Sequence, residues 1–202
     1  MPRSPGLVPI LCAAALLAAG CGSTTTSSTS TTTTSVRVAT TTTAQPPLST
    51  SAPPTSLAWS TTPVSGGGQG GTALLGAVRA AAQDGFDRIT FEFTNRLPGY
   101  KVEYGRRPVL QDGSGREVAV EGATVLTVRM TPASGFDLSG GGRPTYTGPD
   151  RIRPTTSTLV EVVQAGDFEG VVTWVAGVSA DAGFKVSTLE SPPRLVIDVK
   201  AG

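Results

Sequence analysis

The segment Arg88-Ile89-Thr90-Phe91-Glu92-Phe93 decides the fold class of this chain. Its apolar side chains, Ile89, Phe91 and Phe93, alternate with charged or polar ones. A period of two sends successive side chains to opposite faces of a β-strand. The segment therefore predicts a strand with one apolar face turned to a core and one polar face turned to solvent.

Similar patterns recur through the rest of the chain. Tyr100, Val102 and Tyr104 alternate with polar residues, and the valine-rich runs at 158–164 and 171–178 are typical of strands covered on both sides. Further strands are expected at 125–130, 184–188 and 194–199, separated by turn sequences at 95–99, 112–115, 167–170 and 191–193. The alanine-rich segment 73–83 could pass for a helix, but we predict a first strand there.

Many short strands at regular spacing predict an all-β fold, a compact β-sandwich. Its buried residues are expected to be Ile89, Phe91, Phe93, Leu126, Val128, Trp174 and Ile197. Asp87 beside Arg88 predicts a turn with a local ion pair.

The first twenty residues predict export. Arg3 precedes an almost wholly apolar run from Gly6 to Ala19. About fourteen residues make a helix of roughly 21 Å, shorter than a bilayer core of about 30 Å, so the run is typical of a signal peptide. Its end, Leu17-Ala18-Ala19-Gly20-Cys21, resembles the lipobox that directs lipid attachment to cysteine. We predict a lipoprotein signal peptide at 1–20, lipid such as palmitate on Cys21, and a place on the extracytoplasmic face of the cell membrane.

Residues 21–71 are predicted to be a lipid-anchored, disordered linker. Ser, Thr, Pro and Gly dominate this range, which has too little apolar surface to offset the entropy of ordering its backbone. Trp59 is its one large aromatic residue and is expected to be exposed. The folded domain is predicted at 72–202.

Composition excludes several kinds of site. The chain has no histidine, and its two cysteines are Cys12, in the leader, and Cys21. The domain therefore offers no His or Cys ligand for a metal and no nucleophile paired with a histidine base. We expect no cofactor and no metal. From Thr72 onward 14 basic residues face 15 acidic ones, a balance that indicates no nucleic-acid partner.

The domain also resembles a known family. Asp84-Gly85-Phe86-Asp87-Arg88, the strand after it, Pro98-Gly99-Tyr100-Lys101-Val102-Glu103-Tyr104 and Pro193-Arg194-Leu195-Val196-Ile197-Asp198-Val199 are similar to the AMIN-like domain of actinobacterial lipoproteins. The similarity extends over about 74–199. It implies a small β-sandwich with a role at the cell wall, and it implies no particular binding residues.

Candidate binding residues are chosen by their chemistry. Planar aromatic rings can stack on sugars, and arginine can grip a carboxylate with two hydrogen bonds. On these grounds the candidates are Tyr100, Tyr104, Tyr146, Arg151 and Arg153. Asp112-Gly113-Ser114-Gly115 lacks the further ligands of a calcium loop and predicts a hairpin turn.

Two classes of function remain open. The first is a non-catalytic envelope lipoprotein whose domain binds cell-wall polymer (peptidoglycan) or an envelope protein. The second is a cell-wall hydrolase that works with carboxylates alone. A purely protein-binding subunit of an envelope complex is a variant of the first. We favour non-catalytic binding, because catalysis would have to be built without His or Cys.

Overall fold

The computed structural model describes residues 58–68 and 70–202, which form strands and loops. Within these residues no helix has the length and apolar character to cross a bilayer. The predicted signal peptide 1–20, the predicted lipid site Cys21 and residues 22–57 of the predicted linker lie outside the described residues.

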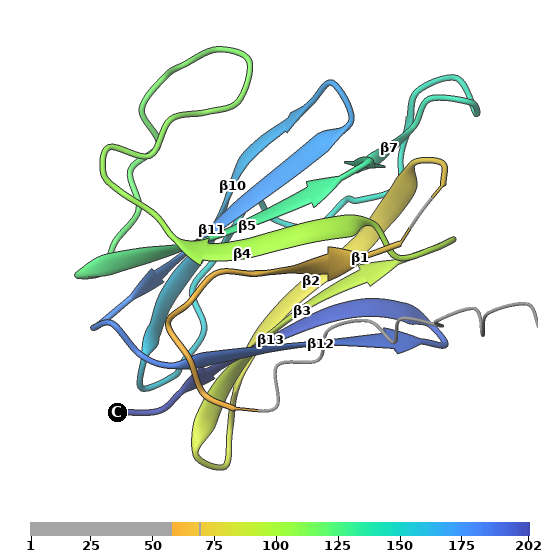
Figure 1. Ribbon diagram of the computed structural model, residues 1–202. Helices are drawn as coiled ribbons and strands as arrows, with labels where there is room; N and C mark the ends of the chain where they lie inside the picture. Colours follow the sequence, from red (N-terminus) through yellow and green to blue (C-terminus); the bar gives the residue numbers. More distant parts are fainter. Residues whose placement is uncertain (1–57, 69) are drawn as a thin grey trace, which may run out of the picture. The chain divides into compact units, whose positions relative to one another are not determined.

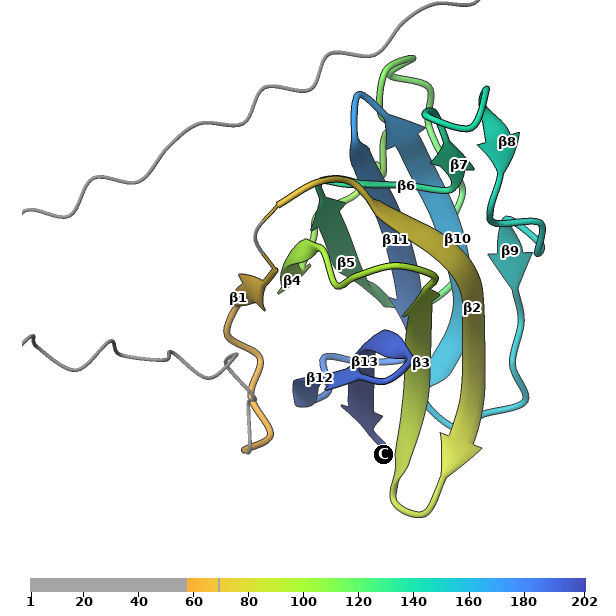
Figure 2. The same cartoon turned by 90° about the vertical axis from the view of Figure 1, so that its right-hand side faces the viewer.

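Two sheets pack face to face in the described chain (Figure 1). The larger has the order β1-β4-β5-β11-β10-β9, with bounds Val64–Gly67, Gly99–Tyr104, Thr124–Thr131, Val171–Val178, Leu159–Phe168 and Arg151–Ile152. The smaller has the order β12-β13-β3-β2-β6, with bounds Phe184–Glu190, Pro193–Lys200, Phe86–Phe93, Ala73–Gln83 and Ala133–Ser134. Neighbours are antiparallel except for the β2–β6 pair. A small hairpin of β7 (Phe136–Asp137) and β8 (Arg143–Pro144) projects beside β9 (Figure 2).

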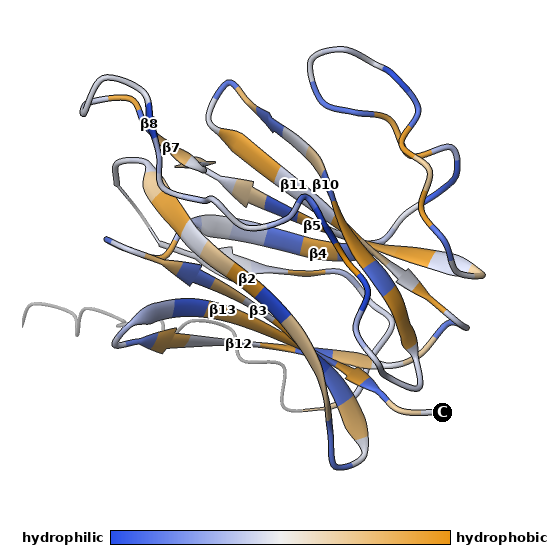
Figure 3. Cartoon of the chain, turned by 180° about the vertical axis from the view of Figure 1, so that it is seen from behind, coloured by the Kyte–Doolittle hydropathy of each residue, from blue (hydrophilic) through white to orange (hydrophobic). Residues whose placement is uncertain are grey.

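The core lies between the two sheets, as the alternating pattern predicted. Phe91 of β3 meets Trp174 of β11 edge to face, with ring centroids 6.1 Å apart. All seven residues predicted to be buried are at most 1% exposed. Hydrophobic and hydrophilic bands alternate along the strands of both sheets (Figure 3). The all-β sandwich prediction is confirmed.

The alanine-rich segment forms the strand β2 rather than a helix. It pairs with β3 from Leu75 to Gln83, and the two strands are joined by the two-residue loop Asp84-Gly85. Gly85 has a φ of 78°, which a two-residue hairpin loop requires and glycine adopts at no steric cost. Local turn chemistry therefore agrees with the cross-strand pairing.

The folded unit begins earlier than predicted. β1 lies inside the predicted linker, yet it pairs with β4 from Val64↔Val102 to Gly67↔Gly99. Trp59, expected to be exposed, is partly buried: its ring lies 6.2 Å from that of Phe86, and Lys185 Nζ lies 4.2 Å above it. The linker boundary at residue 71 is therefore wrong, because pairing with a distant strand orders a segment whose own composition favours disorder.

The structure also corrects the prediction made for Asp87. Asp87 is 1% exposed and accepts hydrogen bonds from the backbone N–H groups of Thr158 and Leu159, at 2.7 and 2.9 Å. Arg88 turns to the other face of β3 and binds Asp198 of β13. The predicted local ion pair is wrong, because adjacent residues of a strand point to opposite faces.

A long loop covers the outer face of the six-stranded sheet. This loop, residues 105–123, joins β4 to β5 and packs Val118 and Val120 onto Val125, Val163 and Val175. The strands β10 and β11 are therefore covered on both sides, as their valine-rich sequences predicted.

Glycine permits the close contact between this loop and the sheet. A Cβ at Gly177 would lie 1.6 Å from the Glu121 carbonyl oxygen. The predicted turn at 112–115 is confirmed at the far end of the loop, where Leu110 bridges to Glu117. There Asp112 accepts a hydrogen bond from Thr173 Oγ1 at 2.5 Å.

Candidate functional site: a groove between the long loop and β9

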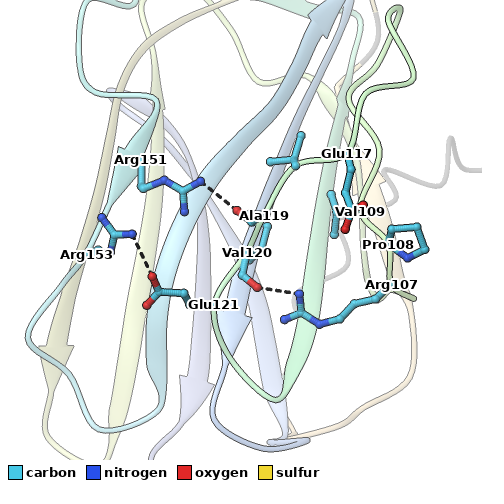
Figure 4. Close-up of a pocket in the computed structure, with 10 residues that line it drawn as sticks. Arg107, Pro108, Val109, Glu117, Ala119, Val120, Glu121, Arg151 and Arg153 are labelled. Atoms are coloured by element: carbon cyan, nitrogen blue, oxygen red, sulfur yellow. Dashed lines mark hydrogen bonds and ion pairs between the residues drawn. The ribbon is translucent and has the colours of Figure 1, made fainter.

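A groove separates the 105–123 loop from β9, with a volume of about 510 Å³ (Figure 4). We call it the β9 groove. One side carries Arg151 and Arg153, and the other carries Arg107, Pro108, Val109 and the loop segment 117–121. A second hollow of about 320 Å³ shares Arg151 and the 117–119 segment and continues toward Arg116. Such volumes suit a small ligand or a short stretch of polymer.

Glu161 forms the base of the site. It lies on β10, its side chain is fully buried, and its Oε1 accepts from Arg151 Nη1 at 2.5 Å and from the Glu121 backbone N–H at 2.7 Å. Its Oε2 accepts no hydrogen bond from the described residues, but Arg153 Nη2 lies 3.2 Å away. One buried carboxylate therefore ties together β9, β10 and the loop.

The charge of Glu161 is stabilised by these contacts. Burial alone raises the pKa of Glu161, but the hydrogen bonds from Arg151 and the Glu121 N–H and the charges of both arginines outweigh it. The net effect lowers the pKa below its ordinary value, so Glu161 is an ionised anchor rather than a proton donor.

The arginines of the groove differ in how they are held. Arg151 uses Nη1 on Glu161 and Nη2 on the Ala119 carbonyl at 2.9 Å. Arg107 donates from both Nη atoms to loop carbonyls, those of Val120 at 2.6 Å and Gly122 at 2.8 Å. Arg153 makes ion pairs through Nη2 only, to Glu161 and to Glu121 Oε1 at 3.1 Å. Arg151 and Arg107 thus hold the loop, and Arg153 faces the groove.

The predicted tyrosines do not join the predicted arginines. Tyr100 is 4% exposed and belongs to the core, so its ring cannot meet a sugar. Tyr104 donates its hydroxyl to the Ala182 carbonyl at 2.6 Å and packs edge to face on Phe184. Tyr146 packs on Trp174 with centroids 5.7 Å apart and donates to the Pro149 carbonyl at 2.5 Å, which fixes the approach to β9. Of the five predicted residues, the structure brings only Arg151 and Arg153 together.

Two acidic residues of the site, Glu161 and Glu121, were not predicted from the sequence. Glu161 stands alone among valines in a strand expected to be covered on both sides, and this pattern could have marked it as a buried charge needing a cation. Glu121 carries no such signal, because it lies forty residues from Glu161 in an irregular loop. Within the described part of the chain, no cluster of three His, Cys, Asp or Glu side chains could hold a metal ion.

Two packed sheets, antiparallel except for the β2–β6 pair, form a small β-sandwich domain with a charged groove on one outer face. The family model of the AMIN-like domain matches residues 73–201, and the chain belongs to this family. Membership suggests a cell-wall-associated binding domain. The match begins with β2, so β1 lies outside it. Searches of curated proteins and of solved structures find no significant match.

Proposed function

We propose that this protein is a non-catalytic lipoprotein of the cell envelope whose AMIN-like domain binds cell-wall polymer in the β9 groove. The observation that carries this proposal is the pair Arg151 and Arg153 lining a groove on a domain of a family associated with the cell wall. Wall polymers with peptide cross-links present sugars and carboxylates, and arginine recognises carboxylates in a fixed geometry.

The two buried carboxylates, Glu161 and Asp87, are poorly suited to hydrolysis. A glycosidase needs one protonated acid and one carboxylate across a cleft. Glu161 is held ionised by two arginines, and Asp87 is fully buried and bound to two backbone N–H groups. Neither side chain is placed to give a proton to a substrate in the groove.

Co-sedimentation tests wall binding. The full-length protein in mild detergent is mixed with purified peptidoglycan at low salt and centrifuged, with a tube lacking walls as the control. We expect the protein to pellet with the walls and to be released as salt is raised, since arginine contacts on a surface are screened. A protein that stays in the supernatant at low salt would remove wall binding.

An envelope protein as the partner is the second candidate. The β7–β8 hairpin exposes Phe136 (44%) and Leu138 (76%) beside a hollow lined by Leu74 and Arg96. Exposed apolar side chains grouped on one loop are typical of protein contacts. In the same sedimentation experiment, failure with walls would leave this candidate in front.

The lipid anchor is tested separately. Because the thiol of Cys21 is the attachment point in the proposed lipoprotein, Cys21→Ser should release the protein from the membrane fraction or leave it unprocessed. Fractionation of cells followed by immunoblotting measures this outcome, with Cys12→Ser as the matched control. Membrane retention and processing unchanged by Cys21→Ser would contradict lipid anchoring.

A further inference from the structure

Arg153 is the arginine of the β9 groove with the most uncommitted donor capacity. Its Nε and Nη1 have no hydrogen-bond or ion-pair partner among residues 58–68 and 70–202, and its side chain is 56% exposed. Both Nη atoms of Arg151 and of Arg107 are already bound within the protein. A ligand that enters the groove therefore finds its free guanidinium edge at Arg153.

The two carboxylates on Arg153 are held very differently. Glu161 is fully buried and is fixed by Arg151 and by the backbone N–H of Glu121. The Glu121 side chain is 63% exposed, and its carboxylate contacts Arg153 alone at 3.1 Å (Figure 4). Exposed ion pairs contribute little to stability, so the Glu121 side chain can leave Arg153 at little cost.

Departure of the Glu121 side chain would not disturb the loop. The backbone N–H of Glu121 stays bound to Glu161, and Arg151 and Arg107 still hold the carbonyls on either side of residue 121. The side chain can thus swing away from a backbone that stays in place.

We propose that the β9 groove binds a ligand carboxylate on Arg153, and that Glu121 occupies the position of this carboxylate until the ligand displaces it. This inference rests on the proposed function for its ligand, the wall peptide, and assigns the part of that ligand the groove recognises. Glu121 is then a built-in competitor that sets the affinity of the site.

The charge balance favours a singly charged ligand group. Around the groove three arginines, Arg107, Arg151 and Arg153, face three glutamates, Glu117, Glu121 and the underlying Glu161. Withdrawal of Glu121 leaves one positive charge in excess, which one carboxylate neutralises. A doubly charged phosphate would leave a negative charge near Glu117.

The apolar wall favours a small side chain next to that carboxylate. Pro108, Val109, Val118 and Val120 line the groove on the side of the loop. A peptide that ends in a small apolar residue with a free carboxylate fits both features. A bare sugar would satisfy neither.

The experiment compares two matched ion pairs on the full-length protein. Glu121→Gln and Arg153→Gln test the groove, and Glu92→Gln and Arg79→Gln test an exposed pair of similar length, 2.9 Å, on the five-stranded sheet. The probes are purified peptidoglycan and the same walls with their carboxylates converted to amides. A third probe, the dipeptide acetyl-alanyl-alanine, is used with a free or an amidated end and followed by NMR.

We expect Glu121→Gln to bind walls and the free dipeptide about threefold more tightly, since a surface competitor is removed. Arg153→Gln should bind about tenfold more weakly, as loss of a charge-assisted contact requires. Amidated probes should bind weakly to all variants, and the two control variants should behave like the wild type.

The outcomes separate the inference from the proposed function. Wall binding by the wild type that neither Glu121→Gln nor Arg153→Gln alters would keep the function and overturn this site. Loss of wall binding together with dipeptide binding that follows Glu121 and Arg153 would keep the site and overturn the polymer. Unchanged melting temperatures for all four variants exclude misfolding as the cause.

Discussion

The outer faces of the two sheets carry the same kind of ion pair in opposite surroundings. On the five-stranded sheet Arg88 binds Asp198 through two hydrogen bonds, at 2.7 and 2.9 Å, with side chains 40% and 15% exposed. On the six-stranded sheet Arg151 binds Glu161 under the 105–123 loop, with side chains 30% and 0% exposed. The first pair lies on the surface, partly exposed to solvent. The second pair neutralises a buried carboxylate, and both of its side chains also hydrogen-bond to the backbone of the loop above.

The core between the two sheets is the reference for this comparison. A substitution there is expected to lower the stability of the protein more than any substitution on the outer faces. Phe91→Ala should lower the free energy of unfolding by about 3 to 5 kcal/mol, because a large buried aromatic leaves a cavity against Trp174. Urea denaturation of the full-length protein measures it. Phe136→Ala, 44% exposed at the hairpin, should change stability by less than about 0.5 kcal/mol. Equal losses would contradict the assignment of faces.

Arg151→Ala should cost about 3 kcal/mol, because it leaves the buried charge of Glu161 without its main partner. Arg88→Ala should cost only about 1 kcal/mol, since its pair is partly exposed to solvent. The same denaturation experiment compares the two. If both variants lose the same stability, cover by the loop does not matter and the contrast between the faces fails.

The contact between loop and sheet can be broken without touching a charge. Gly177→Ala places a Cβ where the Glu121 carbonyl lies, and overpacking of this kind costs about 2 kcal/mol. The displaced loop should also be cut faster by trypsin at Arg106 and Arg116. Gly71→Ala, with only a contact of 3.9 Å to Arg96, is the control and should leave both readouts unchanged. Slow cleavage of Gly177→Ala would mean that the loop is held elsewhere.

Acid should weaken the covered face through Glu161, with the smallest effect of the series. The contacts of Arg151, Arg153 and the Glu121 N–H lower the pKa of Glu161 below the ordinary value of about 4.3. A lowered folded-state pKa adds stability above that ordinary value, and the contribution is lost as the pH falls through the folded-state pKa.

Glu161→Gln removes this contribution, so its stability should fall less than that of the wild type between pH 6 and pH 3. Thermal unfolding across this range measures the difference. Glu92→Gln, which alters an exposed pair, is the control. Parallel curves for Glu161→Gln and the wild type would show that Glu161 is not stabilised in its charged form.

The alternation of apolar and polar residues predicted the inner faces of the sandwich, because this pattern depends only on residues that are neighbours in the sequence. Ile89, Phe91 and Phe93 need no knowledge of distant partners to be placed on one face. The outer faces depend on contacts between residues far apart in the chain, as when Glu161 meets Glu121, or Asp87 meets Thr158. No local pattern encodes such pairs.

The same reason explains the missed strand and the misplaced tyrosines. Val64-Ser65-Gly66-Gly67 has the composition of a linker and becomes a strand only beside β4. Tyr100 and Tyr104 lie on the apolar side of an alternating strand. The alternation predicted the strand correctly, and it also implies that both rings turn inward, away from a ligand. Arg151 and Arg153 were predicted from the chemistry of their side chains. Their partners, Glu161 and Glu121, become apparent only in the folded structure.

The first residues of the folded unit have a mechanical consequence. Ser60 exchanges two backbone hydrogen bonds with Phe184 at the edge of the five-stranded sheet, and a few residues later β1 joins the edge of the six-stranded sheet. This one segment is thus fastened to both layers of the sandwich. A force applied at residue 58 would therefore load the Ser60–Phe184 bridge first and the β1–β4 pairing after it. The groove is not mechanically separate from that edge, because its loop wall, residues 105–123, continues directly from β4, the strand that pairs with β1.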